Sequence, residues 1–147
     1  MSAVTQSVDA FEIRKEVLIA APIELAFEAT LDELGPDNQM PDGKPFPLKL
    51  EPWPGGRWYR DLGNNSGHFW GHVQVIKPPT LLEIVGPMFM SYPVISHIQY
   101  RVTEKSGGST LTLTHRAIGE ISPQHREGVG HGWKHILEQI KAKSRRK

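Results

Sequence analysis

The end of the chain places the strongest limit on its fold, because residues 123–147 have the apolar periodicity of one long amphipathic helix. The residues that share one stripe, at about 100° per residue, are Val129, Trp133, Ile136, Leu137 and Ile140. A single long helix set against a many-stranded antiparallel sheet must bury this stripe on the concave face of the sheet. A curved sheet seldom fills all the space around a helix, so we predict an internal apolar cavity.

Seven strands precede this helix in the pattern of alternating apolar and polar residues. They are expected over 11–19, 48–50, 57–62, 68–76, 81–85, 94–103 and 110–117, with Gly- and Pro-rich turns between most of them. Apolar residues recur at helical spacing over 23–34, directly after Pro22, which predicts a short helix behind the first strand. The fold class is therefore α+β, with a curved seven-stranded antiparallel sheet around the C-terminal helix. Residues 1–9 are expected to be a loose tail, and 10–147 a single domain.

The segment 35–47 interrupts this regular pattern, because four prolines and two glycines crowd into it. A long irregular loop in a compact domain is usually functional or mobile. Two interpretations stay open at this point: a lid over the cavity, or a plain mobile connection.

Charge and composition exclude several classes of function. The chain has 17 basic and 16 acidic residues, and this net charge of +1 gives no electrostatic footprint for nucleic acid. Cysteine is absent, so a thiolate nucleophile and disulfides are excluded, as suits a reducing compartment. The first ten residues lack an apolar signal-peptide core, and no apolar run is long enough to span a membrane. We therefore expect a cytoplasmic protein with no membrane partner.

Several short motifs, in a fixed order along the chain, resemble those of a known superfamily. They lie at 17–22 (VLIAAP), 54–58 (PGGRW), 71–73 (GHV), 78–82 (PPTLL), 110–115 (TLTLTH) and 132–133 (GW). The chain resembles the SRPBCC (START-like, helix-grip) superfamily over about residues 11–143. Within it, the chain is similar to small bacterial proteins of the group named for activators of the heat-shock protein 90 ATPase. The resemblance implies a helix-grip fold, and its members include ligand carriers, cyclases, hydrolase-like enzymes and co-chaperone domains.

Strand parity predicts which side chains face the cavity. Trp58 and Leu62 are expected to face the cavity, and Arg60 lies on the same face of this strand, so it is expected to point inward as well. An inward Arg60 needs an anion, either a carboxylate or phosphate of a ligand or an internal partner such as Glu83.

His115 shares its strand face with apolar residues, so it is expected to point into the grip. Two interpretations stay open: a general base or hydrogen-bond donor toward a ligand, or a satisfied core histidine. The remaining candidates for the cavity wall are Met88, Met90, Tyr100 and Trp133, and flexible methionines suit irregular apolar ligands.

The strand over 68–76 is expected to turn Trp70 to the convex face, which suggests a protein interface or a homodimer there. His68 and His72 would share that face about 13 Å apart, too far for one metal ion. His131 and His135 are expected on the solvent side of the last helix, with Lys134 beside them. We expect neither a metal site nor a cofactor.

Three hypotheses follow from these patterns. Binding of an apolar or amphipathic small molecule ranks first, with Trp58, Arg60, Met88, Met90, Tyr100, His115 and Trp133 as candidate ligand contacts. A protein-interaction module ranks second, either binding a chaperone or forming a homodimer through Trp70. A cyclase- or hydrolase-like enzyme using Arg60 and His115 ranks third.

Overall fold

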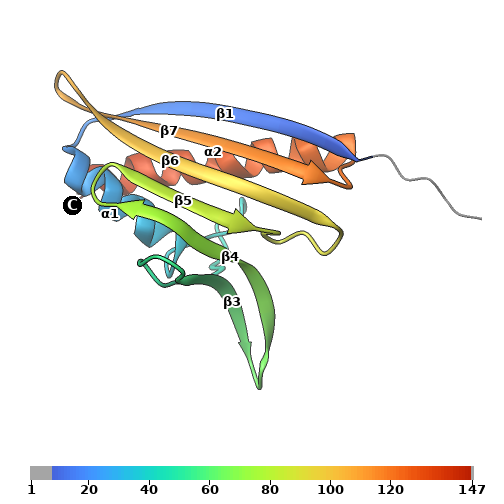
Figure 1. The fold of residues 1–147 in the computed structure, drawn as a ribbon. Coiled ribbons are helices and arrows are strands. Elements are labelled where there is room, and N and C mark those ends of the chain that lie inside the picture. The colour runs from blue at the N-terminus through green and yellow to red at the C-terminus, as the bar shows by residue number, and fades with distance from the viewer. Residues whose placement is uncertain (1–7, 147) are drawn as a thin grey trace, which may run out of the picture.

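The computed structural model describes residues 8–146 and shows an α+β fold in which a curved sheet encloses two helices (Figure 1). Its elements are β1 (Asp9–Ile19), α1 (Ile23–Leu34), β2 (Lys49–Leu50), β3 (Arg57–Gly63), β4 (Ser66–Lys77), β5 (Leu81–Gly86), β6 (Val94–Lys105), β7 (Gly108–Gly119) and α2 (Pro123–Arg146). The predicted fold class is confirmed. Most of the expected loose tail lies outside the described residues, and β1 already begins at Asp9.

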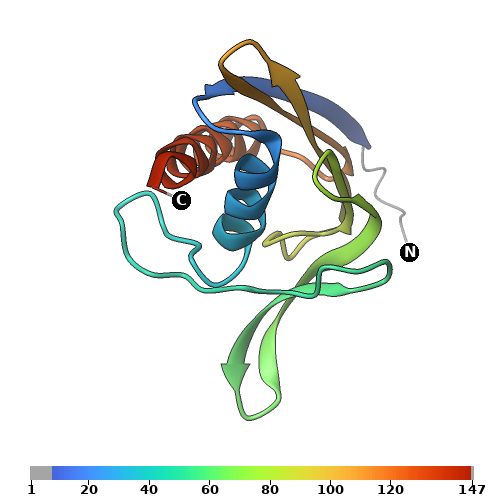
Figure 2. The same ribbon diagram turned by 90° about the vertical axis from the view of Figure 1, so that its left-hand side faces the viewer.

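The seven strands form one sheet in the order β1-β7-β6-β5-β4-β3-β2, with antiparallel pairing throughout. The sheet curves around α2 and α1, which lie on its concave side (Figure 2). The pairing of β1 with β7 is uninterrupted from Asp9↔Gly119 to Ile19↔Ser109. Regular alternation therefore holds in this half of the sheet, where inward residues of β7 such as Leu111 and Leu113 are fully buried.

The other half of the sheet is irregular. Trp58 pairs with Gly71 and Tyr59 with Phe69, which leaves Trp70 as the extra residue of a β-bulge in β4. A bulge reverses the alternation of side chains, and Trp70 consequently turns inward with only 9% of its surface exposed, whereas Phe69 is 45% exposed. The expectation that Trp70 lies exposed on the convex face was wrong for this reason.

The β3–β4 hairpin extends away from the body of the molecule (Figure 2). Its tip is a tight turn in which Asn64 and Asn65 both adopt positive φ. Leu62 lies on this extension and is 55% exposed, so its predicted place inside the sheet was also wrong. Strand parity fails here because the hairpin runs beyond the helices that would cover it.

The helix α2 buries the predicted stripe. Val129, Trp133, Leu137 and Ile140 are buried, and Ile136 is partly buried against them. At the other end of α2, Lys143 forms ion pairs with Asp37 and Glu33, so it fastens α2 to the end of α1 and to the loop behind it.

Candidate functional site

A pocket of about 300 Å³ opens between α2, the loop 35–47 and the irregular half of the sheet. Its lining is mostly apolar and comes from four parts of the chain: the loop, β3 and β4, the segment after β5, and α2.

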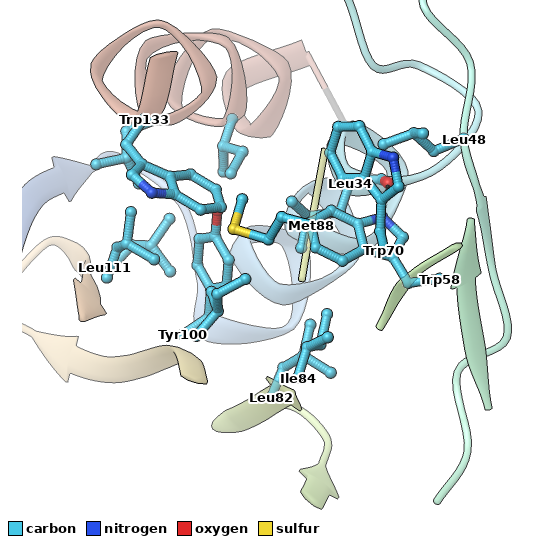
Figure 3. Packing of buried hydrophobic residues seen from close by; sticks show 14 of the residues in the cluster. Leu34, Leu48, Trp58, Trp70, Leu82, Ile84, Met88, Tyr100, Leu111 and Trp133 are labelled. Carbon is cyan, nitrogen blue, oxygen red and sulfur yellow. Dashed lines mark hydrogen bonds between the residues drawn. The ribbon is translucent and has the colours of Figure 1, made fainter. Parts of the chain in front are cut away.

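The sheet side of the pocket is built from two tryptophans. Trp58 and Trp70 pack edge to face, with ring centroids 5.0 Å apart and planes at 74° (Figure 3). The indole Nε1 of Trp58 donates a hydrogen bond of 2.7 Å to the carbonyl oxygen of Leu34, the last residue of α1. This bond satisfies the polar atom of a side chain that is 1% exposed, so Trp58 is held in one orientation.

The loop 35–47 contributes Asn38, Gln39, Met40, Pro41 and Phe46 to the lining. It folds back on itself, because Phe46 N donates to Asn38 O and Met40 N to Lys44 O, each at 2.8 Å. Asn38 is itself buried and donates from Nδ2 to the carbonyl of Glu33. The loop is therefore a hydrogen-bonded wall of the pocket; opening it as a lid stays a prediction.

Met88 and Phe89, directly after β5, form a further wall. Met88 has a φ of 60°, and its backbone N donates to Trp70 O at 2.9 Å. This turn directs the Met88 side chain between Trp70 and Trp133 (Figure 3). Phe89 is half exposed, with its ring 5.9 Å from that of Trp70. Met90 joins the buried core instead of the pocket lining.

The helix side of the pocket is α2, where two glycines remove side chains that would otherwise occupy the space. A Cβ added at Gly128 or Gly132 would meet nothing within 4 Å, and both residues line the pocket. Val129, Trp133 and Ile136 supply apolar surface beside them.

Trp133 lies between the pocket and a region of fully buried side chains. Its ring lies edge to face with Tyr100, with centroids 6.1 Å apart, and with His115, at 5.7 Å. Tyr100 and His115 are fully buried in this region and are not part of the pocket wall. Trp58, Met88 and Trp133 are thus the predicted contacts that the structure brings together.

His115 points toward α2, as expected, and both of its ring nitrogens are engaged. Trp133 Nε1 donates to His115 Nδ1 at 2.9 Å, so in the neutral ring Nε2 carries the proton and donates to Ser96 Oγ at 2.8 Å. Burial lowers the pKa of His115 from 6.5 to about 4, which keeps the ring neutral at pH 7. This geometry matches the interpretation as a satisfied core histidine.

Arg60 lies outside the pocket, with its guanidinium carbon 3.7 Å from the ring centroid of Phe46. Among the described residues, no hydrogen-bond partner is found for its buried Nη1. Glu83, the internal partner considered above, instead accepts a hydrogen bond from Gln99 and lies 3.7 Å from His97.

His135 was missed as a pocket residue, because it was expected on the solvent side of α2. It lines the pocket, and within residues 8–146 its buried Nε2 has no hydrogen-bond partner. His135 follows Gly128 by seven residues and Gly132 by three, which places all three on one face of the helix. This spacing was the signal available in the sequence. The sequence did not reveal that the loop 35–47 lies opposite this face of α2 and forms a pocket with it.

Within residues 8–146, no cluster of three or more His, Cys, Asp or Glu side chains is arranged to hold a metal ion. Neither of the described helices has the length and apolar character needed to cross a bilayer.

Comparison with solved structures shows the same fold in distant proteins. An uncharacterised protein from Rhizobium leguminosarum is 16% identical, with a TM-score of 0.72 over 96% of this chain and 98% of that one. Protein MLL2253 from Mesorhizobium loti is 17% identical, with a TM-score of 0.66 over 92% and 98%. The protein named Ara h 8.0201 is 14% identical, with a TM-score of 0.65 over 96% and 100%.

A search among curated proteins found no match. The family model described as activator of Hsp90 ATPase homolog 1-like protein matches residues 20–144, which is most of the chain. The motifs at 54–58 and 132–133 lie within that range and supply Trp58, Gly132 and Trp133 to the pocket. With the helix-grip fold, this match shows that the chain belongs to the family of activator of Hsp90 ATPase homolog 1-like proteins.

Proposed function

We propose that this protein binds a small apolar or amphipathic molecule in the pocket between α2, the loop 35–47 and the β3–β4 half of the sheet. The observation that carries the proposal is a pocket of about 300 Å³ with three tryptophans in its wall, namely Trp58, Trp70 and Trp133. Ligand pockets of this size are typically apolar with a few polar groups that orient the ligand. A cytoplasmic location, in keeping with the absence of cysteine, is part of the proposal.

The sequence of α2 supports this function over simple packing. Glycine in a helix interior costs up to about 1 kcal/mol relative to alanine, yet Gly128 and Gly132 lie where an alanine methyl group would fit. Gly130 has the same open space without lining the pocket, so the support comes from Gly128 and Gly132 facing the pocket together. Keeping the space free is what a binding site requires.

Catalysis has less support. A base must reach its substrate within hydrogen-bond distance, but His115 is bonded to Trp133 and Ser96 and lies behind the pocket wall. Arg60, the other candidate, packs against the ring of Phe46 outside the pocket. Protein interaction remains the second candidate, because the family takes its description from an activator of the Hsp90 ATPase.

Native mass spectrometry of the purified protein, compared with its denatured mass, tests the proposal. We expect an extra mass on the wild type that disappears on denaturation and is lost in Gly132→Leu, which fills the pocket. Gly130→Leu is the matched control, because Gly130 lies between the two pocket glycines but outside the lining. A wild type without extra mass, or an extra mass kept by Gly132→Leu, would count against the proposal.

A further inference from the structure

One residue of the pocket lining has a buried side-chain nitrogen that is unsatisfied. His135 lines the pocket, and its Nε2 has no hydrogen-bond partner among residues 8–146. A buried polar group without a partner destabilises the protein, so a ligand group that bonds to it gains affinity. An imidazole nitrogen accepts or donates according to its tautomer, and a hydroxyl group can serve either way.

The polar side chains of the pocket lining come from only two parts of the chain, the loop 35–47 and α2. The polar lining residues are Asn38 and Gln39 of the loop and His135 of α2, whereas the sheet and the segment after β5 contribute only tryptophan, methionine and phenylalanine. Among the described residues that line the pocket, none carries a carboxylate, an ammonium or a guanidinium group. Such a site disfavours a charged ligand, because a buried charge without a partner is costly.

The dimensions and the aromatic wall restrict the ligand further. A dry cavity of about 150 Å³ is known to hold benzene, so about 300 Å³ has room for roughly two fused rings. Trp58 and Trp70 offer flat faces and edges to such rings, in the offset and edge-to-face arrangements that aromatic pairs prefer.

We propose that the pocket selects an uncharged, planar molecule of about two fused rings whose hydroxyl group bonds to His135 Nε2. This inference rests on the proposed binding function and adds the class of ligand. His135 is then the residue that determines specificity, while the tryptophans supply most of the contact area.

Three probes of similar size test the inference by isothermal titration calorimetry at pH 7. They are 2-naphthol, 2-methylnaphthalene, in which a methyl group replaces the hydroxyl, and the anion 2-naphthoate. In the wild type we expect 2-naphthoate to bind at least tenfold more weakly than 2-naphthol. In His135→Phe, which keeps a ring but removes the nitrogens, we expect the preference for 2-naphthol over 2-methylnaphthalene to fall about fivefold.

The outcomes separate the two proposals. If none of the probes binds the wild type, the class of planar two-ring ligands is overturned, whereas the binding function itself is decided by the extra mass in native mass spectrometry. If the probes bind but His135→Phe keeps the same preference for 2-naphthol, the role of His135 is overturned while binding stands. If 2-naphthoate binds most tightly of the three, the proposal of an uncharged ligand is overturned, and the result would indicate that Arg60 pairs with the carboxylate. Should His135→Phe not fold, a crystal structure of the wild type with 2-naphthol decides, since the hydroxyl oxygen must lie within about 3.2 Å of Nε2.

Discussion

The space between the sheet and α2 differs on the two sides of Trp133. On the β1–β7–β6 side, which we call the filled side, Tyr100, His115 and Leu111 are fully buried beneath a sheet of regular register, and none of them lines the pocket. On the β3–β4 side, the register is broken by bulges and a pocket of about 300 Å³ remains. Figure 3 shows Tyr100 and Leu111 on one side and Trp58 and Trp70 on the other, with Met88 between them.

This difference shows that a helix-grip fold alone does not make a binding site. The same helix closes both sides, but only the pocket side has glycines at Gly128 and Gly132 and a bulge that turns Trp70 inward. Where side chains alternate regularly, they interdigitate to the density of a protein interior. Space is left where the alternation breaks and the facing side chain is absent.

The largest difference in the free energy of unfolding is expected when one apolar side chain is truncated on the filled side and one on the pocket side. Leu111→Ala removes a fully buried side chain and should lower the free energy of unfolding by about 2–5 kcal/mol. Phe89→Ala, at the half-exposed mouth of the pocket, should cost less than about 1 kcal/mol. Urea denaturation of both variants measures the difference. Equal losses would mean that the pocket side is packed as tightly as the filled side.

The filled side should also give the protein a pH dependence through His115. The pKa of His115 is about 4 in the folded protein and 6.5 for an ordinary histidine side chain, so the unfolded chain binds an extra proton between these values. Stability is therefore full above about pH 6.5 and falls as the pH drops toward 4, by on the order of 3 kcal/mol.

His115→Gln should remove this contribution, although it lowers stability at pH 7 by breaking bonds to Trp133 and Ser96. The measurement is urea denaturation of both proteins from pH 7 to pH 4. If wild type and variant lose stability in parallel over this range, His115 is not the group responsible.

A smaller effect is expected from two alanine substitutions in α2, one inside the pocket lining and one outside it. Gly132→Ala and Gly130→Ala should each stabilise the protein by up to about 1 kcal/mol, because alanine is the better helix former and neither Cβ meets another atom. Only Gly132→Ala adds a methyl group to the pocket and should weaken 2-naphthol binding. Thermal melts and calorimetric titrations of the two variants check this pair; equal weakening by Gly130→Ala would contradict the assigned lining.

The smallest effect is expected near the turn that precedes β3. Hydrogen bonds from the Arg57 side chain and backbone lower the pKa of Glu51 to about 2. This exposed pair contributes above about pH 4.5 and is lost as the pH falls through 2. Glu51→Gln should lower the melting temperature only slightly at pH 7, since solvent screens the pair. A large drop would show that the pair stabilises the fold by more than an exposed, screened ion pair can.

The fold could be predicted from sequence because its signals are periodic. Alternation located the strands, and the stripe on α2 located the helix that they enclose. The site was only partly predictable. Parity placed Trp58 inward, but it cannot detect a bulge, so it placed Trp70 on the wrong face. His135 was missed because its burial depends on a loop distant in sequence, which no local pattern reports.

The most direct test of the pocket uses the side-chain NMR signals of its own tryptophans. The chain has four tryptophans, of which Trp58, Trp70 and Trp133 line the pocket and Trp53 lies on an exposed turn. In a titration of ¹⁵N-labelled protein with 2-naphthol, we predict saturable shifts of the three pocket indole N–H signals and none for Trp53. Unchanged signals at millimolar 2-naphthol, or equal shifts for Trp53, would contradict a binding pocket on this side of Trp133.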